Sequence, residues 1–201
     1  MKKWIKYGVG AVVILVACAL YSNVDKMHNV YDGEQDNSSY VTIGPVTEMG
    51  SVVQSFKSVD EKMDGIAFKV SVPEGVPEGT LDYTLTGEDG REIIADSIPI
   101  SQIESGKVYK ASFDETVQIE NGEVLTISFG SSDLSEDQEI YLYYEQIQKA
   151  ETELEVKGEV VEGCMILRTY VHKFDIETFI VTLGFAAYIA VFLRVLYKLF
   201  S

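Results

Sequence analysis

Hydrophobic residues are concentrated at the two ends of the chain. Residues 7–21 carry no charge and consist mostly of valine, alanine, isoleucine and leucine, and a second uncharged run covers residues 179–193. With the three residues before it, the first run approaches the ~20 residues that a helix needs to cross a bilayer. The pattern predicts one transmembrane helix in residues 1–22 and another in residues 177–200.

Between the two ends, apolar and polar residues alternate. A period of two is typical of a strand with one face on a core and the other in water. It is found in residues 66–72, 81–86, 109–114 and 125–129. Short apolar runs predict further strands at residues 52–56, 93–98, 140–144, 154–156 and 165–171. Asp89-Gly90 and Asn121-Gly122 separate such runs and are typical of tight hairpins.

The predicted strands indicate the fold class. Many short strands separated by turn sequences are typical of an antiparallel β-sandwich or jelly roll. We therefore predict an all-β domain, a β-sandwich or jelly roll, in residues 49–173, flanked by the two transmembrane helices. The mostly polar residues 23–48 are predicted to form a stalk.

The net charge of −16 is unevenly distributed. Residues 23–176 contain 11 basic and 31 acidic residues, whereas no acidic residue occurs before Asp25 or after Glu177. The acidic middle argues against nucleic acid as a partner, because binding it needs clustered lysine and arginine. Basic residues at the outer ends of both apolar runs predict that both termini are cytoplasmic and that the central domain lies outside the membrane.

One part of the domain resembles a known family. Ser51-Val-Val-Gln-Ser-Phe-Lys-Ser58 is followed by an acidic turn, by Gly65-Ile-Ala-Phe-Lys-Val70, and later by Thr80-Leu-Asp-Tyr-Thr-Leu-Thr-Gly-Glu-Asp-Gly90. This order resembles the extracytoplasmic jelly-roll domains, similar to galactose-binding modules, of bacterial envelope polysaccharide-assembly membrane proteins. It covers about residues 50–172, and Phe68 stands where the pattern has valine. The resemblance implies a fold and a bacterial cell-membrane location but no activity, because the matching residues are structural.

The chain has few candidate catalytic groups. Cys18 lies in the first apolar run and Cys164 lies in the domain, so the two do not pair if Cys18 stays in the bilayer. Cys164 is predicted to be a buried structural residue, with an intermolecular disulfide as the alternative. His28 and His172 are the only histidines, and no zinc-binding spacing occurs. We therefore expect a protein that is not an enzyme.

Cys18 also suggests a different processing of the N-terminus. Residues 15–18, Leu-Val-Ala-Cys, match a lipoprotein cleavage box, in which Cys18 would be lipidated. An uncleaved helix, a lipoprotein signal and an ordinary cleaved signal remain alternatives. The domain faces outward in all three.

Two groups of residues are candidates for ligand binding. Asp133, Glu136 and Asp137 are carboxylates in a predicted turn, where oxygen ligands suit a structural calcium ion, and a solvated acidic surface is the alternative. No other cofactor is expected. Tyr141 and Tyr143 lie on one face of a predicted strand and are candidates for a glycan-stacking platform, with packing inside the domain as the alternative.

Small residues in the second apolar run indicate helix packing. Gly184 and Ala187 share one helical face, and helices in lipid associate by close approach at such residues. We predict that this helix packs through them against the first helix or against a helix of a partner protein.

The sequence leaves three functions open. The first is a non-catalytic membrane protein that binds or positions cell-envelope glycan or a glycan-assembly partner. The second is a structural or interaction subunit of a larger membrane complex. The third is a polysaccharide chain-length regulator. Such proteins usually have a mixed helical outer domain and a proline-rich stretch before the second span, whereas the outer domain of this chain is predicted to be all-β and the chain lacks that stretch.

Overall fold

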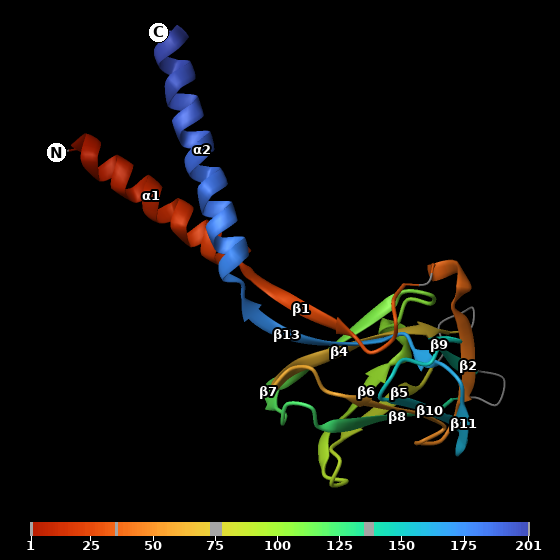
Figure 1. The fold of residues 1–201 in the computed structure, drawn as a ribbon. Helices are drawn as coiled ribbons and strands as arrows, with labels where there is room; N and C mark the ends of the chain where they lie inside the picture. Colours follow the sequence, from red (N-terminus) through yellow and green to blue (C-terminus); the bar gives the residue numbers. More distant parts are fainter. Residues whose placement is uncertain (1, 35, 73–77, 135–138, 201) are drawn as a thin grey trace. The chain divides into compact units, whose positions relative to one another are not determined.

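A computed structural model describes residues 2–34, 36–72, 78–134 and 139–200 (Figure 1). They form two compact units, one built from residues 27–171 and the other from the two ends of the chain. We call the first unit the β domain and the second the terminal unit, and each is described by itself.

The chain begins with α1 (Lys2–Tyr21), β1 (Asn23–Asn29), the 3-10 helix η1 (Asn37–Ser39), β2 (Val41–Val46), β3 (Val52–Lys57), β4 (Lys62–Ser71), β5 (Thr80–Thr86), β6 (Glu92–Pro99) and the 3-10 helix η2 (Ile100–Gln102). It continues with β7 (Val108–Gln118), β8 (Val124–Ser132), β9 (Ile140–Glu145), β10 (Thr152–Val156), β11 (Glu159–Val161), β12 (Cys164–Met165), β13 (Leu167–Phe174) and α2 (Ile176–Phe200). The nine predicted strands are present, the last of them as β12 and β13.

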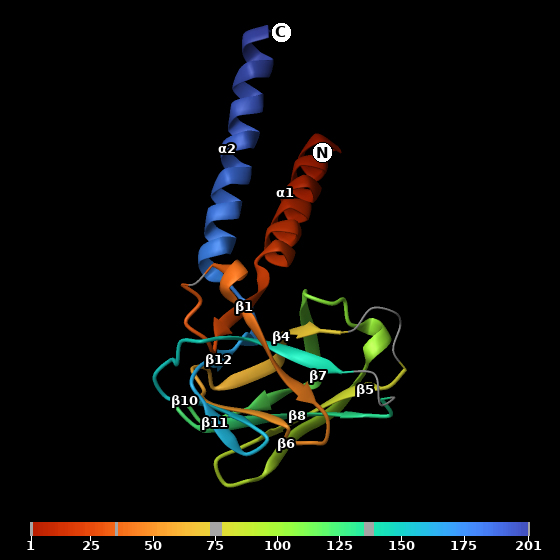
Figure 2. The ribbon, with the colours of Figure 1, turned by 90° about the vertical axis from the view of Figure 1, so that its right-hand side faces the viewer.

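The strands build a β-sandwich of two sheets. In the described residues, a seven-stranded sheet has the order β1-β13-β4-β9-β12, with β2 also paired to β9 and β7 also paired to β4. A six-stranded sheet has the order β11-β10-β3-β8-β5-β6. Figure 2 shows both layers, with β4 and β12 in one and β8, β10 and β11 in the other. The pairings of β3 with β8 and of β4 with β7 are antiparallel, as predicted.

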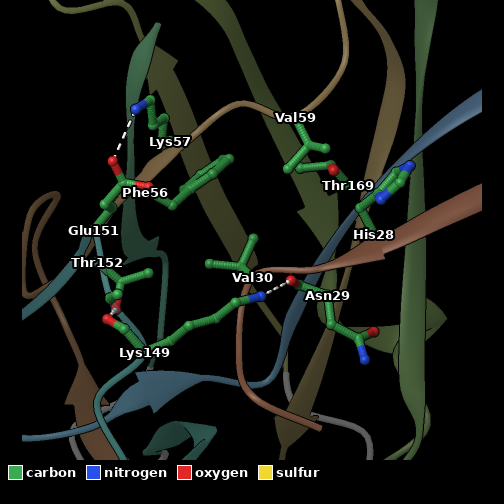
Figure 3. Close-up of a pocket in the computed structure, with 11 residues that line it drawn as sticks. His28, Asn29, Val30, Phe56, Lys57, Val59, Lys149, Glu151, Thr152 and Thr169 are labelled. Atoms are coloured by element: carbon green, nitrogen blue, oxygen red, sulfur yellow. Dashed lines mark hydrogen bonds and ion pairs between the residues drawn. The ribbon is translucent and has the colours of Figure 1, made fainter. Parts of the chain in front are cut away.

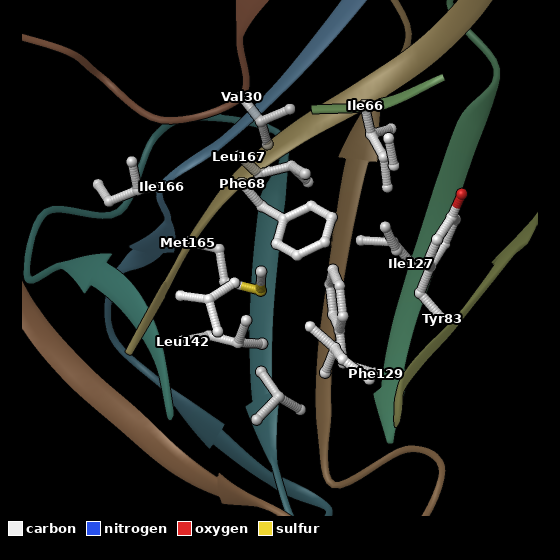
Figure 4. Close-up of a cluster of buried hydrophobic side chains, with 14 of the residues drawn as sticks. Val30, Ile66, Phe68, Tyr83, Ile127, Phe129, Leu142, Met165, Ile166 and Leu167 are labelled. Carbon is white, nitrogen blue, oxygen red and sulfur yellow. The ribbon is translucent and has the colours of Figure 1, made fainter. Parts of the chain in front are cut away.

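Apolar side chains from both sheets form the core between them (Figure 4). Phe68 of β4 lies with its ring centroid 4.9 Å from that of Phe129 in β8 and 6.3 Å from that of Tyr83 in β5. All three are at most 1% exposed. The apolar positions of the alternating strands therefore face inward from both sheets and form one shared core.

A buried amide connects the sheets at another point. Gln54 of β3 is fully buried; its Nε2 donates to the Glu153 carbonyl at 2.9 Å, and its Oε1 accepts from the Met165 backbone N–H at 2.9 Å. Met165 belongs to the other sheet. Gln54 therefore satisfies a buried backbone donor of the opposite sheet.

Residues 23–48 differ from the predicted polar stalk. They contain β1, η1 and β2, and Tyr31 and Val46 are 1% and 0% exposed. The prediction failed because the few core residues of this segment are outnumbered by polar ones. Val30 and Tyr31 are adjacent, whereas Ile43 and Val46 lie three positions apart, so the buried residues follow no fixed period in the sequence.

The terminal unit contains α1, α2 and the adjoining ends of β1 and β13. α2 is long and apolar enough to cross a membrane. The apolar part of α1 with described side chains, Gly8–Tyr21, is shorter, so the span predicted at the N-terminus, in residues 1–22, is not confirmed. Asp175 precedes α2 and accepts hydrogen bonds from the N–H groups of Glu177 and Thr178, which lower its pKa.

Gly184 and Ala187, the predicted helix-packing residues, are not covered by other residues of the terminal unit. α2 has no buried residue, and a Cβ added to Gly184 would meet no atom within 4 Å. Ala187 is also exposed. In the described residues, α1 therefore does not pack on Gly184 and Ala187, and packing against a partner's helix stays a prediction.

Candidate functional site

One candidate site with aromatic side chains is a groove between the edge strands β6 and β7. In the described residues β6 pairs only with β5, and β7 pairs only with β4. The groove has a volume of about 430 Å³ and is lined by residues 93–96 of β6, residues 112–117 of β7, and Tyr83. We call it the edge groove.

A large bulge in β7 shapes one wall of the edge groove. Met63 is paired with Val117 and Gly65 with Ser112, so Asp64 alone lies opposite residues 113–116 of β7. The Thr116 hydroxyl donates to the Asp64 carboxylate across this bulge. Bulges redirect side chains at sheet edges. Here the bulge presents Phe113, Asp114 and Glu115 to the groove.

The edge groove combines carboxylates with aromatic rings. The Tyr83 hydroxyl lies 3.4 Å from Asp96 Oδ2 and donates to it. Burial, and then the negative charge of Asp96, raise the pKa of Tyr83, so the phenol keeps its proton. Phe113 is half-buried and packs against the core, whereas Asp96, Asp114 and Glu115 are exposed. Carboxylates that accept hydrogen bonds beside a half-buried aromatic ring suit a hydroxyl-rich ligand.

Sequence reasoning missed the edge groove. The sequence does contain one signal of the bulge. The alternation of the predicted strand at 109–114 stops at Asp114-Glu115-Thr116, where the bulge lies. The meeting of β6 with β7 was not predictable, because they belong to different sheets.

A second, smaller cavity lies where β1 and β3 end and β10 begins (Figure 3). Its volume is about 110 Å³. Val30, Phe56 and Val59 form an apolar part, and polar groups at its edge come from His28, Asn29, Lys57, Lys149, Glu151, Thr152 and Thr169. We call it the end pocket.

The predicted glycan platform lies on the outer side of β9. Tyr141 and Tyr143 alternate with the buried Ile140 and Leu142, and both are half-exposed. Lys69 Nζ lies 4.6 Å from the ring centroid of Tyr143, so a cation already occupies a face of that ring. The Tyr141 hydroxyl donates to Glu139, which raises the pKa of Tyr141. Glycan stacking at this pair stays a prediction.

The predicted calcium ligands are only partly described. Asp133 is exposed and has a positive φ of 60°, whereas Glu136 and Asp137 lie outside the described residues. Among the residues that the structure describes, no group of three or more His, Cys, Asp or Glu side chains is placed to hold a metal ion. Calcium binding stays a prediction, which thermal unfolding with calcium and with a chelator tests.

Both cysteines are buried free thiols. Cys18 of α1 is 4% exposed, and its lipidation stays a prediction. Cys164 is fully buried, and burial raises the pKa of its thiol to about 12. His172 Nδ1 lies 2.9 Å from Asp25 Oδ1, within the terminal unit, so it is not a partner for Cys164.

A further buried acid was not predicted. Glu145 is fully buried at the end of β9; its Oε1 accepts from the Asp32 N–H, and its Oε2 has no hydrogen-bond partner in the described residues. Nearby, Arg168 donates two hydrogen bonds to the Tyr31 hydroxyl, at 3.0 and 2.6 Å. The cluster fastens residues 30–32 to the seven-stranded sheet.

Comparisons with known proteins do not assign a family. No family model and no curated protein matches the sequence. A solved structure of the clostridial cysteine protease Cwp84 after propeptide cleavage is similar with a TM-score of 0.49 and 6% identity, over 74% of this chain and 40% of that chain. The cysteine protease and lectin-like domains of Cwp84, a surface-layer-associated protein of Clostridium difficile, give a TM-score of 0.48 and 8% identity, over 74% and 36%.

A structure of infectious bursal disease virus, Gx strain, gives a TM-score of 0.30 and 12% identity, over 74% of this chain and 36% of that chain. This chain thus spans two fifths or less of the length of these proteins. The likenesses are too low to support an argument about activity. The assignment as a β-sandwich rests on the two sheets of this chain.

Proposed function

We propose that the protein is a non-catalytic, membrane-anchored module that binds cell-envelope glycan in the edge groove. In this proposal α1 and α2 both cross a bacterial cell membrane, both termini are cytoplasmic, and the β domain lies outside. The galactose-binding-like resemblance of the sequence agrees with this function.

The observation that carries the proposal is the composition and size of the edge groove. Its volume of about 430 Å³ lies in the ~300–1,000 Å³ range of ligand pockets. Asp96, Asp114 and Glu115 offer acceptors for sugar hydroxyls, and Phe113 offers an apolar surface for a sugar ring. The groove is open at a sheet edge, so a long glycan chain is able to pass along it.

The test is binding of envelope polysaccharide by the full chain in detergent. Asp96→Asn and Phe113→Ala should each weaken binding about tenfold or more, because each removes a contact worth ~1–3 kcal/mol. Asp89→Asn, a change in an exposed hairpin outside the groove, is the matched control and should leave binding unchanged.

The same experiment includes Tyr141→Ala and Tyr143→Ala. If these variants lose binding while the groove variants keep it, the glycan lies on the outer side of β9 and the groove assignment is wrong. If no envelope glycan binds the wild-type protein, the glycan function itself is contradicted.

One observation favours the second candidate function, an interaction subunit. The unpaired edges of β6 and β7 expose backbone donors and acceptors that a strand of a partner protein is able to pair with. Cross-linking from β6 to a membrane partner would support it. The chain-length-regulator hypothesis gains no support, because the described residues of the β domain contain two 3-10 helices and no α-helix.

A further inference from the structure

The end pocket is an unusual place for positive charge in this molecule. Residues 27–171 contain nine lysine and arginine residues against 29 acidic ones. Lys57 and Lys149 both line the end pocket, and Glu151 is its one acidic lining residue. His28 also lines it, but its Nε2 lies 3.1 Å from Asp60 Oδ2, so only the two lysines are counted as positive charge. The cavity is therefore locally cationic inside a strongly anionic domain.

The size of the end pocket limits what it holds. Its volume of about 110 Å³ is below the ~300–1,000 Å³ of pockets for whole drug-sized ligands. It is still several times the ~30 Å³ that one water occupies in the liquid. A group of a few heavy atoms fits it, with the rest of the ligand outside.

The two lysines are used differently. Lys149 Nζ donates to the carbonyls of Asn29 and Tyr31 at 2.6 and 3.3 Å, so it holds the pocket wall. Lys57 Nζ instead lies 2.8 Å from the Glu151 carboxylate at the edge of the pocket (Figure 3). This ion pair is exposed, with 44% and 65% of the two side chains accessible, and an exposed pair is weak.

The backbone conformation of Glu151, whose carboxylate pairs with Lys57, is unfavourable. Its φ is +64°, a left-handed conformation that residues other than glycine rarely adopt. The turn is fastened on both sides, because the Thr152 hydroxyl donates to the Lys149 carbonyl at 2.8 Å and Gln148 Nε2 donates to the Thr152 carbonyl at 2.8 Å. Strained residues of this kind are concentrated at ligand sites.

We propose that the end pocket binds an oxyanion group, the carboxylate or phosphate of a small ligand or glycan substituent, which replaces the Glu151 carboxylate on Lys57. Glu151 is an internal competitor for that position. Thr169 supplies a hydroxyl donor, and Val30, Phe56 and Val59 contact the apolar part of the ligand. This site is independent of the edge groove.

The experiment titrates the full chain in detergent with glucuronate, inorganic phosphate and glucose at fixed ionic strength. The proposal expects saturable binding of glucuronate or phosphate, and binding of glucose at least about tenfold weaker, since glucose lacks the charge. Glucuronate and phosphate in separate titrations distinguish the two sources of the oxyanion.

Variants of the ion pair give opposite expected effects. Glu151→Gln should tighten anion binding about two- to fivefold, because an exposed competing pair is removed. Lys57→Gln should weaken it about tenfold or more, because the charged donor is lost. Lys57→Arg keeps the charge and should retain binding, which separates loss of the site from loss of folding.

Lys107 and Glu104 form the matched control. They make an exposed ion pair at 2.6 Å away from the end pocket. Lys107→Gln and Glu104→Gln change the net charge of the protein by the same amounts and should leave anion binding unchanged. Equal effects of the control and pocket variants, no tightening by Glu151→Gln, or no saturable anion binding would each overturn the proposal.

Discussion

Asp82 on β5 shows how a single acid is stabilised in this acidic domain. The hydroxyl groups of Thr80, Ser97 and Ser132 all donate to its carboxylate. Burial acts to raise its pKa, but the three hydrogen bonds outweigh burial and lower it. The ionised carboxylate is therefore the form that stabilises the fold.

The lowered pKa of Asp82 fixes the sign of a pH dependence. Its contribution to the free energy of unfolding is present above the ordinary value of 3.8 and is lost as the pH falls through the folded-state value. Asp82→Asn should destabilise the protein by about 1 kcal/mol at neutral pH. Thermal unfolding should show this difference shrinking below about pH 4, whereas a constant difference would contradict the assignment.

The Cys164 thiol should be unreactive in the folded protein. Its pKa is raised to about 12 by burial, so almost no thiolate is present at neutral pH. In a Cys18→Ser background, a maleimide should label Cys164 at least about a hundredfold more slowly in the native protein than in denaturant. Rapid native labelling would contradict its structural role.

At the scale of elements, the contact between β3 and β12 depends on Gln54. Replacing it with leucine keeps the volume but leaves the buried Met165 N–H without its acceptor. Gln54→Leu should lower the free energy of unfolding by about 2 kcal/mol, the cost of an unsatisfied buried donor. Denaturant unfolding measures it, and the exposed Gln146→Leu on the loop after β9 is the control.

The helix α2 is expected to recognise another helix. Gly184→Leu combined with Ala187→Leu should reduce cross-linking to a partner's helix in membranes while insertion is retained, because leucine is at least as apolar. Ala186→Leu with Ala190→Leu changes a different face and serves as the control. Unchanged cross-linking in the first double variant would make α2 a plain anchor.

At the scale of the whole molecule, the proposed topology has a direct test. In intact cells an added protease should cut within residues 27–171 and leave tags at both termini protected, because basic residues at the outer ends of both helices hold them inside. An accessible C-terminal tag would contradict this topology. If a lipid is found on Cys18 and is absent in Cys18→Ser, the N-terminal anchor is a lipid and not a transmembrane helix α1.

The sequence alone predicted those parts of the fold that depend on local pattern. Alternation and short apolar runs predicted β3 to β10, and Asp89-Gly90 predicted the hairpin of β5 and β6, because each signal is contained in a few consecutive residues. The hairpin predicted at Asn121-Gly122 is wrong, because the strands on either side of it, β7 and β8, belong to different sheets. It missed β1, β2 and β11, whose apolar residues are too sparse to show a period.

Only the tertiary structure decided which residues share a site. Asp96 and Phe113 meet because the edges of two different sheets lie together, and Lys57 meets Glu151 although 94 positions separate them. Neither meeting leaves a spacing in the sequence, since the packing of the two sheets sets the first and the pairing of β3 with β10 sets the second. The same packing buries Gln54 and Glu145, which a polar composition alone places at the surface.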